Sequence, residues 1–543
     1  MKHYLSRLRE TIAANWNRKA LCDYGGAGYT FGEMAMSIGR LHLMLDSLGV
    51  VKGDKISICG KNQARWAVSF LAVNTYEAVA VPILADFTPE SICSIVDHSE
   101  STVLFTDADM WKHLDIAKMP NVKAVINISD FSLLHGGDGS RKALRSWREA
   151  FVEKYPLGFS AEDVHYPTDN GKDPAVINYT SGSTGDPKGV VLRYECLSAN
   201  VEFGQDHIPS YPGDNLLSIL PMAHMFGMVF EMLYPLCGGA TIYFLGKTPG
   251  PTLLVKAMGE VKPYLVIAVP MVFEKIYRSK LKPALDKPSV KALTKIPLIR
   301  HLVYKKMRKG VDSAFGGNVR EYVMGGAAVN PEVEDFLKRI GFHFTVGYGM
   351  TEAAPLLAYS PWQTFAPHTC GKVMDFAQLR IDSDDPERVV GEIQARGVNL
   401  FSGYYKNEKA TRASFTSDGW FKTGDLGLID RNGNVCIKGR SKSMLLSSNG
   451  QNIYPEEIEC QINILPYVQE SLVVSREGVL AALVCIDEKA VQKDGKDVEM
   501  LRVEILHGIN AKVPKYSRIS KVEFLPEPFQ KTPKQSIKRF LYK

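Results

Sequence analysis

The sequence predicts an α/β protein: a large, layered N-terminal domain of α/β subdomains followed by a small, mobile α+β C-terminal lid domain. The chain of 543 residues is too long to bury a single core, so we expect more than one domain. Short apolar runs alternate with helical patterns through most of the first 440 residues, which is typical of buried sheets covered by helices. Near Arg440 turn-rich hairpins such as DRNGN at 430–434 give way to a different sequence pattern, and we expect the last hundred residues to form a small α+β domain.

Apolar runs of strand length mark the sheets of the N-terminal domain. The first run, at 56–60, precedes a helical pattern at 64–78 and a second run at 78–83. The segment 132–170 is polar and irregular by comparison, so we expect it to be an excursion over the surface. Further strand-length runs occur at 176–180, 216–220, 241–245, 265–269 and 321–325.

A glycine-rich segment at 179–190, YTSGSTGDPKGV, predicts a phosphate-binding loop. Its glycines let several backbone N–H groups point into one concavity, its hydroxyls add donors, and Lys188 adds a positive charge. It does not match the GxxxxGK loop that joins a strand to a helix, because β-branched, strand-like runs lie on both sides. A flexible Ser/Gly hairpin with a solvated lysine is the alternative interpretation.

One helix start can be justified residue by residue. Asn330 is suited to cap a helix, Pro331 fits the first helical position, and Glu332 complements the helix dipole. We therefore expect a helix at 331–340 that ends at Gly341. It separates two loops, 324–329 and 348–352, which follow predicted strands and so are expected to meet at the ligand-binding edge of a sheet.

The change in sequence pattern near Arg440 sets the predicted domain boundary. We assign residues 1–439 to the N-terminal domain and residues 440–543 to the lid domain, with a hinge at Lys442. An ordinary exposed turn with basic side chains is the alternative interpretation of this junction.

Composition restricts the classes of partner and compartment. The net charge is +6, but the 65 basic and 59 acidic residues are spread along the chain, which argues against a nucleic-acid surface. The nine cysteines form neither CxxC pairs nor a disulfide pattern. The N-terminus lacks a signal-peptide core and no apolar run reaches transmembrane length, so we expect a cytoplasmic protein and leave peripheral membrane contact open.

The glycine-rich segment resembles the signature loop of the adenylate-forming (AMP-binding) superfamily, and further motifs extend this resemblance over nearly the whole chain. They occur in the family's order, and their wording is most similar to that of long-chain fatty acyl-CoA ligases. The motifs are LPMAHMFG at 220–227, MGGAAV at 324–329, VGYGMTE at 346–352, FKTGDLG at 421–427, the hinge segment at 438–459 and the tail loop at 531–543.

The resemblance implies a site for ATP and Mg²⁺. Lys188 would meet the β- and γ-phosphates, Thr351 the α-phosphate, and Thr184 and Glu352 the metal ion. Tyr348 offers an aromatic face to adenine, Asp425 can accept hydrogen bonds from the ribose, and Arg440 can reinforce that contact. A core tyrosine and a turn-capping aspartate are the alternatives. The full predicted nucleotide set is Thr180, Ser181, Gly182, Ser183, Thr184, Gly185, Lys188, Gly325, Gly326, Ala327, Tyr348, Gly349, Met350, Thr351, Asp425 and Arg440.

The resemblance also implies an acyl site. His224 would lie beside the acyl carboxylate, while Phe226, Gly325 and Gly326 would line the channel beyond it. A histidine that satisfies the core or caps a helix is the competing interpretation of His224.

The tail loop departs from the family pattern. Members end in KTxxxKIxR, whose second lysine reaches the carboxylate and the α-phosphate, but this chain has Ser536 at that position. Serine cannot supply the cation, and losing one charge-stabilising contact slows such a reaction strongly. Lys534 and Lys538 flank the position, so the predicted catalytic set is Lys188, Thr351, Glu352, Lys534 and Ser536.

Together these features predict an ATP-dependent fatty acyl-CoA synthetase that works through an acyl-adenylate, with fatty acid, ATP and CoA as substrates. Two alternatives stay open: transfer to an acyl carrier protein, and a degenerate protein that binds ATP or acyl-adenylate without turnover. Acyl chain length and oligomeric state are not determined by the sequence.

Overall fold

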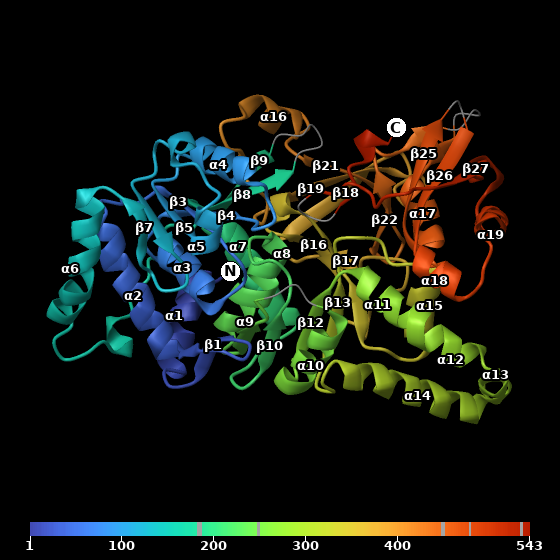
Figure 1. Cartoon of the computed structure of the whole chain (residues 1–543), viewed down its shortest axis with the longest axis horizontal. Coiled ribbons are helices and arrows are strands. Elements are labelled where there is room, and N and C mark those ends of the chain that lie inside the picture. The colour runs from blue at the N-terminus through green and yellow to red at the C-terminus, as the bar shows by residue number, and fades with distance from the viewer. Residues whose placement is uncertain (182–186, 247–249, 447–450, 477–478, 533–535, 543) are drawn as a thin grey trace.

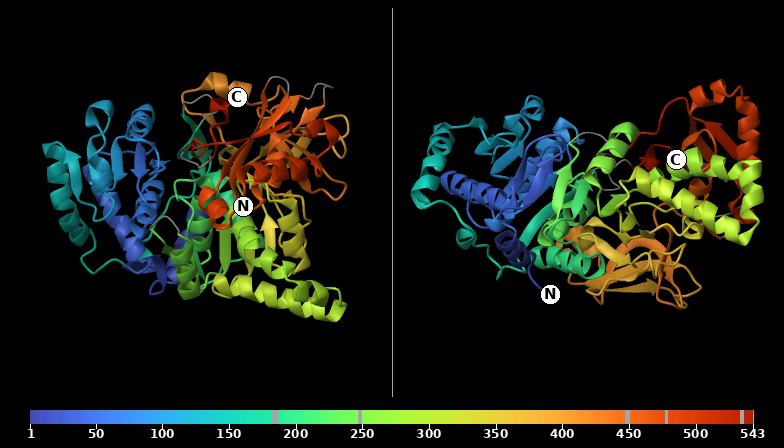
Figure 2. Two further views of the ribbon diagram at one scale, coloured as in Figure 1. Left: turned by 45° about the vertical axis from the view of Figure 1, so that its right-hand side comes forward. Right: turned by 90° about the horizontal axis from the view of Figure 1, so that it is seen from below.

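A computed structural model describes residues 1–181, 187–246, 250–446, 451–476, 479–532 and 536–542. The molecule is mixed α/β, with a large N-terminal domain and a small C-terminal domain (Figure 1). In both further views the C-terminal domain lies against one side of the large domain (Figure 2).

An eight-stranded sheet forms one layer of the large domain. Its central strands are parallel and buried, and the buried helix α3 (Ala64–Thr75) packs on β3 and β4. The predicted runs at 56–60, 78–83 and 176–180 form strands of this sheet. The strand order is β20 (Gly403–Tyr404), β9 (Pro187–Arg193), β8 (Pro174–Ser181), β4 (Val79–Ile83), β3 (Lys55–Cys59), β5 (Val103–Thr106), β6 (Ala124–Asn127) and β7 (Leu133–Gly136).

The segment 132–170 corrects the sequence-based expectation. It contains strand β7 and a 17-residue helix, α6 (Asp138–Lys154), which packs against α2 (Phe31–Ser47). Trp147 and Phe151, four residues apart, lie on one helix face and are buried. The guanidinium of Arg40 lies 5.0 Å from the Phe151 ring centroid. Because most residues of α6 are polar, the average polarity of the segment concealed the helix.

Two further sheets bring the motif loops together. In each of them strands run parallel, and β10, β13 and β14 end directly before the segments 219–227, 325–329 and 347–352. Ligands bind at such carboxyl ends of parallel strands. The sheets are β10 (Asn215–Ser218), β11 (Thr241–Phe244), β1 (Lys19–Asp23) and β2 (Gly28–Thr30), and β12 (Leu265–Ala268), β13 (Glu321–Met324) and β14 (Phe344–Val346).

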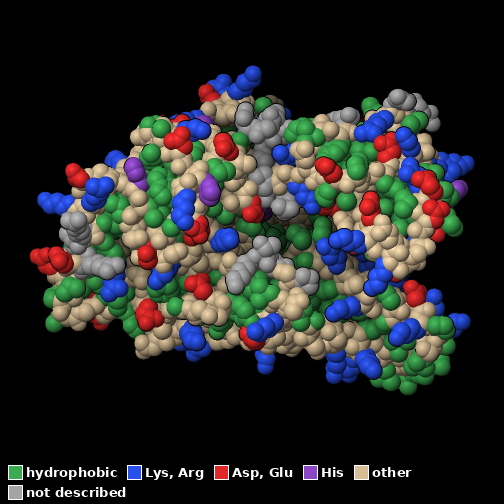
Figure 3. Space-filling model, viewed as in Figure 1, with side chains coloured by type: hydrophobic (Ala, Val, Ile, Leu, Met, Phe, Trp, Pro, Cys, Tyr) green, Lys and Arg blue, Asp and Glu red, His purple; other side chains and the backbone are tan. Residues whose placement is uncertain are grey.

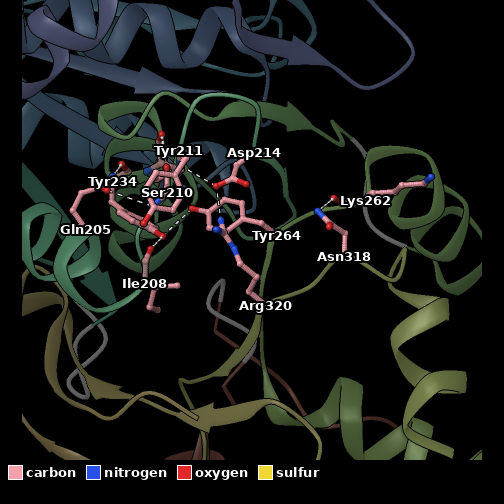
Figure 4. A network of polar contacts seen from close by, with 11 residues as sticks. Gln205, Ile208, Ser210, Tyr211, Asp214, Tyr234, Lys262, Tyr264, Asn318 and Arg320 are labelled. Carbon is pink, nitrogen blue, oxygen red and sulfur yellow. Dashed lines mark hydrogen bonds and ion pairs between the residues drawn. The ribbon is translucent and has the colours of Figure 1, made fainter. Parts of the chain in front are cut away.

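A polar network ties these two sheets together at the opposite, amino-terminal ends of their strands (Figure 4). Arg320, before β13, pairs with Asp214, before β10. The Arg320 guanidinium also lies 4.5 Å from the ring centroid of Tyr264, before β12. The Tyr264 hydroxyl donates to the Tyr234 hydroxyl at 2.8 Å. The network therefore fixes the two sheets at the ends remote from the motif loops.

The predicted helix at 331–340 is confirmed as α15 (Pro331–Arg339). The Asn330 side chain accepts a hydrogen bond from the Glu332 amide at 2.9 Å, which is the expected cap. Gly341 follows the helix with φ of +68°, the left-handed conformation that favours glycine.

Antiparallel strands connect the large domain to the chain's last motifs. Asp425 lies in the strand β21 and is paired in register with Arg440 at the end of β22. The sheets are β15 (Tyr348–Gly349), β16 (Leu356–Tyr359) and β17 (Lys372–Val373), and β18 (Ala377–Asp382), β19 (Gly391–Gly397), β21 (Phe421–Ile429) and β22 (Val435–Arg440).

The C-terminal domain is α+β and docks on the large domain. Arg278 donates to the carbonyl oxygens of Asn463, Leu465 and Val468 at 3.0, 3.2 and 2.7 Å. Ile464 also packs into an apolar core of the large domain. The elements of the C-terminal domain are β23 (Leu445–Leu446), β24 (Asn452–Ile453), α17 (Pro455–Asn463), β25 (Val468–Arg476), β26 (Val479–Ile486), α18 (Glu488–Lys493), α19 (Val498–Asn510) and β27 (Lys521–Phe524).

Other helices cover the large domain. In the part of the chain that the structure describes, no helix combines the length and the apolar character needed to cross a membrane. These helices are α1 (Tyr4–Ala14), α4 (Pro89–His98), α5 (Ala108–Trp111), α7 (Tyr194–His207), α8 (Met225–Gly227), a π-helix (Met228–Leu233), α9 (Tyr234–Cys237), α10 (Pro251–Val261), α11 (Pro270–Ile276), a second π-helix (Tyr277–Leu281), α12 (Lys282–Asp286), α13 (Pro288–Thr294), α14 (Pro297–Ala314) and α16 (Glu408–Ala413).

A buried acid, Glu231 of the first π-helix, holds the segment that follows β10. Its Oε2 accepts hydrogen bonds from the Ser218 hydroxyl at 3.0 Å and from the amides of Ile219 and Leu220, both at 2.9 Å. Burial raises the pKa of Glu231 to about 8. The carboxyl group is therefore largely protonated in the folded protein at neutral pH, and it fixes the start of the 220–227 motif.

We predict that Glu231→Gln makes the stability of the protein less sensitive to a rise in pH from about 4.5 to about 8. Between the ordinary pKa of 4.5 and the folded value of about 8, the folded state retains a proton that the unfolded chain releases. The free energy of unfolding of the wild type therefore falls as pH rises through this window. Measured melting temperatures should fall less for Glu231→Gln than for the wild type, whereas the exposed-site control Glu153→Gln should follow the wild type. Parallel pH curves for wild type and Glu231→Gln would refute the assignment.

Candidate active site

Asp425 joins two other predicted nucleotide-binding residues. The Tyr348 hydroxyl donates to Asp425 Oδ2 at 2.8 Å, and Arg440 Nε pairs with Asp425 Oδ1 at 2.8 Å. Asp425 lies within strand β21, so the turn-capping alternative is not what the structure shows. A carboxylate offers about four acceptor positions, so each oxygen retains capacity for a further donor such as a ribose hydroxyl.

Burial shifts the pKa values of Asp425 and Tyr348. It raises the pKa of Asp425, and the Arg440 guanidinium and the Tyr348 hydrogen bond oppose that shift. Burial and the neighbouring Asp425 raise the pKa of the Tyr348 hydroxyl well above its ordinary value, so Tyr348 remains a donor. Tyr348 is also part of the main apolar core, as the core-tyrosine alternative held. The Arg440 side chain is 59% exposed and thus reaches solvent from the buried Asp425.

Tyr404, which the sequence analysis did not identify, joins two other predicted residues. Its hydroxyl donates to Glu352 Oε1 at 3.0 Å, and Lys188 Nζ lies 5.1 Å from its ring centroid. Burial and the adjacent Glu352 raise the pKa of Tyr404, so its hydroxyl remains protonated as a donor. The signal in the sequence was the strand-like GYY after the buried Phe401, which gave no indication of a contact with Glu352.

The structure describes the predicted phosphate loop only at its two ends. Strands β8 and β9 pair as an antiparallel hairpin, in which Thr180 lies opposite Lys188 and Ser181 opposite Pro187. This confirms that two strands flank the loop. Gly182, Ser183, Thr184 and Gly185 lie outside the described residues.

Close backbone packing explains one of the predicted glycines, Gly349. A Cβ atom on Gly349 would lie 2.0 Å from the Pro355 carbonyl oxygen, so only glycine fits there. The neighbouring Met350 amide donates to the same oxygen at 2.7 Å, and Thr351 begins the short 3₁₀ turn Thr351–Ala353 that carries Glu352. The segment 348–352 is thereby held rigidly at the edge of β16.

The predicted acyl residues lie together beside this segment. A Cβ atom on Gly325 would lie 3.1 Å from the Phe226 ring and 3.6 Å from the Gly347 carbonyl oxygen. Gly326 has φ of +81°, and Ala327 follows it in the same loop. His224 Nδ1 accepts a hydrogen bond from the Phe226 amide at 3.3 Å, so His224 caps helix α8 as the capping interpretation held.

A small apolar cavity of about 20 Å³ lies under these loops. Phe226 and Phe230 line one side of it, and Ile267 and Val323 of the parallel sheet line another. Leu356 also lines it and is paired with Gly349 across β15 and β16. Strand β16 thus lies between the cavity and the segment 348–352.

The predicted hinge and tail loop lie on the C-terminal side. Lys442 occupies an exposed turn between β22 and β23, where the amides of Ser443 and Met444 both donate to the Arg440 carbonyl at 3.0 Å. The Ser536 carbonyl accepts a hydrogen bond from the Thr532 amide at 2.8 Å. Lys534 lies outside the described residues.

The tail loop is anchored to its own domain in this structure. Arg539 pairs with Glu459 and, at 3.5 Å, with Glu456, both on α17. Lys531 pairs with Glu470 on β25 at 2.5 Å, and the Lys538 amide donates to the Gln530 carbonyl at 2.9 Å. The structure therefore does not bring Ser536 or Lys538 into contact with the residues around Glu352.

Comparison with known proteins identifies the family. The family of AMP-binding enzymes matches residues 8–405, and the AMP-binding enzyme C-terminal domain matches residues 442–542. The chain is 30% identical over 490 residues to the long-chain-fatty-acid–CoA ligase FadD15 of Mycobacterium bovis, covering 85% of this chain and 78% of that protein. It is 29% identical to the long-chain-fatty-acid–CoA ligase 4 of Saccharomyces cerevisiae, covering 83% and 70%.

Solved structures agree at the level of the fold. The anthranilate CoA ligase AuaEII in complex with anthranoyl-AMP superposes with a TM-score of 0.81 at 20% identity, covering 99% of this chain and 96% of that one. ATP-bound MatB from Rhodopseudomonas palustris gives a TM-score of 0.77 at 23% identity, covering 100% and 98%. The chain belongs to the AMP-binding enzyme family and is an AMP-forming acid–thiol ligase.

Proposed function

We propose that this ligase is a long-chain fatty acyl-CoA synthetase that activates its acid as an acyl-adenylate in the site around Tyr348, Glu352 and Asp425. The observation that carries the proposal is the set of apolar side chains that line the small cavity beneath the strand pair β15 and β16. These apolar side chains mark the path that a hydrocarbon chain would take under the loop once they move apart, so that the carboxylate emerges beside the polar residues. The curated relatives named as long-chain-fatty-acid ligases support the same substrate class.

Different residues would bind the base, the ribose and the phosphates of the nucleotide. In the proposal the ribose hydroxyls donate to Asp425, whose orientation is fixed by Tyr348 and Arg440. Lys188 neutralises charge on the β- and γ-phosphates, and Thr351 donates to the α-phosphate. Tyr348 is buried, so the adenine would contact the exposed edge of the 348–350 segment and the backbone of 325–327.

ATP and CoA are the co-substrates of this ligase, with Mg²⁺. Among the described residues no three His, Cys, Asp or Glu side chains form a metal-binding group. One carboxylate fits a Mg²⁺ ion that takes its remaining ligands from phosphates and water. Glu352 is suited to this role because Tyr404 fixes one of its oxygens. Bound there, Mg²⁺ would neutralise charge on the phosphates as pyrophosphate departs.

The reaction would proceed in two displacements. The carboxylate oxygen attacks the α-phosphorus, and the bond from that phosphorus to pyrophosphate breaks. The CoA thiolate then attacks the acyl carbon of the adenylate, and AMP leaves. We propose that the lid pivots at Lys442 between the two steps and shields the adenylate from water.

An acyl-carrier-protein acceptor and a degenerate binding protein remain the alternatives. A substrate series separates them: the protein is incubated with ATP, Mg²⁺ and acids from acetate to oleate, either with labelled pyrophosphate and no CoA, or with CoA. We expect pyrophosphate exchange without CoA, and AMP with acyl-CoA in equal amounts when CoA is present, greatest for long-chain acids. Exchange without thioester would favour a carrier acceptor. ATP binding without exchange for any acid would reject the synthetase proposal.

Tyr404→Phe is predicted to weaken Mg²⁺-dependent turnover. It removes the hydroxyl that orients the Glu352 carboxylate, and a hydrogen bond to a charged group contributes about 1.5–3 kcal/mol, or roughly tenfold or more in rate. Initial rates of ATP–pyrophosphate exchange across a Mg²⁺ titration measure the effect, and Glu352→Gln should abolish exchange. The adjacent Tyr405→Phe is the matched control, because its hydroxyl bonds Glu100 instead. Equal rates for both Tyr variants would remove Tyr404 from the site.

Ser536→Lys is predicted to accelerate adenylation more than thioester formation. It restores a cation at the position where the family pattern has lysine, and this cation would act on the charge that develops at phosphorus. ATP–pyrophosphate exchange should rise strongly, while thioester formation from pre-made acyl-adenylate should change little. Gln530→Lys adds the same charge elsewhere in the tail and serves as the control.

If Ser536→Lys gives no gain, Lys534→Ala and Lys538→Ala identify whether a neighbouring lysine already supplies the charge. Loss of exchange in one of these variants would show rescue by that lysine. Full exchange in both, with no gain from Ser536→Lys, would show that adenylation in this protein does not need a tail-loop cation.

A further inference from the structure

Three consecutive helices, α12, α13 and α14, form an arm that extends from the large domain (Figures 1 and 2). We define the α12–α14 arm as residues 282–314. Helix α14 has 18 residues, and Val311 near its end is buried in the core around the β12–β14 sheet. The other end of α14 and the turn before it lie away from this core.

The outer part of the arm exposes large apolar side chains. Leu298 is 82% exposed, Leu302 62%, Ile296 49% and Leu293 41%. Single exposed apolar residues are ordinary, but these four lie within ten residues of the chain, on α13, the following turn and the first two turns of α14. In the space-filling view, an apolar patch with lysine and arginine side chains beside it lies at the lower right, where Figure 1 shows α13 and the start of α14 (Figure 3).

The arm is also strongly basic. Between residues 282 and 309 it carries nine lysines and arginines and one acidic residue, Asp286, although the whole chain has a net charge of only +6. The expectation of evenly spread charge is therefore wrong for this part of the molecule. Within the described residues, several of these cations have no carboxylate at ion-pair distance; they are Lys287, Lys295, Arg300, Lys305, Lys306 and Lys309.

On α14, exposed leucines and lysines lie along one face of the helix. Leu298, Leu302, Lys305 and Lys309 follow one another at intervals of four, three and four residues, so they lie on the same face of α14. The leucines are toward the outer end of the arm and the lysines toward the body. An amphipathic element of this kind inserts its apolar side chains at the boundary between lipid headgroups and acyl chains, where cations meet anionic headgroups.

We propose that the α12–α14 arm docks the protein on an anionic lipid surface, with Leu298 and Leu302 inserted and Lys305 and Lys309 on the headgroups. A projecting arm with an apolar end fits a deformable lipid interface. A nucleic acid would match the lysines but leave the leucines exposed to water. The proposal does not rest on the proposed acyl substrate, because it concerns binding to lipid and not turnover.

Vesicle co-sedimentation tests the proposal. The full-length protein is mixed with vesicles of phosphatidylcholine alone, or of phosphatidylcholine with phosphatidylglycerol, at low and high salt. We expect binding to the anionic vesicles that weakens with salt, since each lysine near such a surface contributes about 1 kcal/mol. The double variants Leu298→Ser/Leu302→Ser and Lys305→Glu/Lys309→Glu should each lower the partition coefficient at least about tenfold.

Matched controls use equivalent positions elsewhere. Leu157→Ser removes a fully exposed leucine outside the arm, and Lys489→Glu/Lys493→Glu reverses two exposed lysines spaced four apart on α18. Both controls should bind as the wild type does, and all variants should keep the wild-type melting temperature because the altered side chains are exposed. The proposal fails if the wild type does not bind anionic vesicles at low salt, or if the arm variants bind no worse than the controls. An acidic carrier protein would then be the next partner to test on this surface.

Discussion

The buried carboxylate of Asp425 is the interaction on which the arrangement of the site depends. It is bonded to Tyr348, from the loop after the parallel β12–β14 sheet, and to Arg440, at the last residue of strand β22. These partners come from parts of the chain almost one hundred residues apart, and a buried carboxylate without them would be strongly destabilising. The loop, the β21–β22 hairpin and the start of the connection to the C-terminal domain are thus held in one arrangement.

The second polar group depends on a similar contact between distant segments. Strand β20 pairs with β9, and this pairing places Tyr404 between Lys188 and Glu352. Glycine is required where these loops cross the backbone of β16 or the ring of Phe226, since a Cβ atom would collide at Gly349 and press on the ring at Gly325. Rigid strands and close backbone packing therefore position the polar atoms, while the cavity beneath them is formed by the same strands on their apolar side.

Sequence patterns predicted those features that depend on local chemistry. Buried strands appear as continuous apolar runs, and the cap at Asn330 appears as a polar residue before proline, so β3, β4, β13 and α15 could be placed. Helix α6 was missed because Trp147 and Phe151 on its buried face stand among mostly polar residues. Tyr404 and Glu231 were missed because their roles arise from tertiary contacts between segments far apart in sequence. The basic arm was overlooked for a different reason, since averaging charge over the whole chain conceals a local excess of lysine.

The most direct test of this account is nucleotide binding by Asp425→Asn, measured by titration calorimetry with ATP and Mg²⁺ alongside the melting temperature. Asparagine keeps the size of the side chain but removes the charge that pairs with Arg440 and one of the two acceptor oxygens. The account predicts a folded protein whose dissociation constant for ATP rises roughly tenfold or more, as expected for loss of a hydrogen bond to a charged group. An unchanged dissociation constant in a folded variant would contradict the central place given to Asp425.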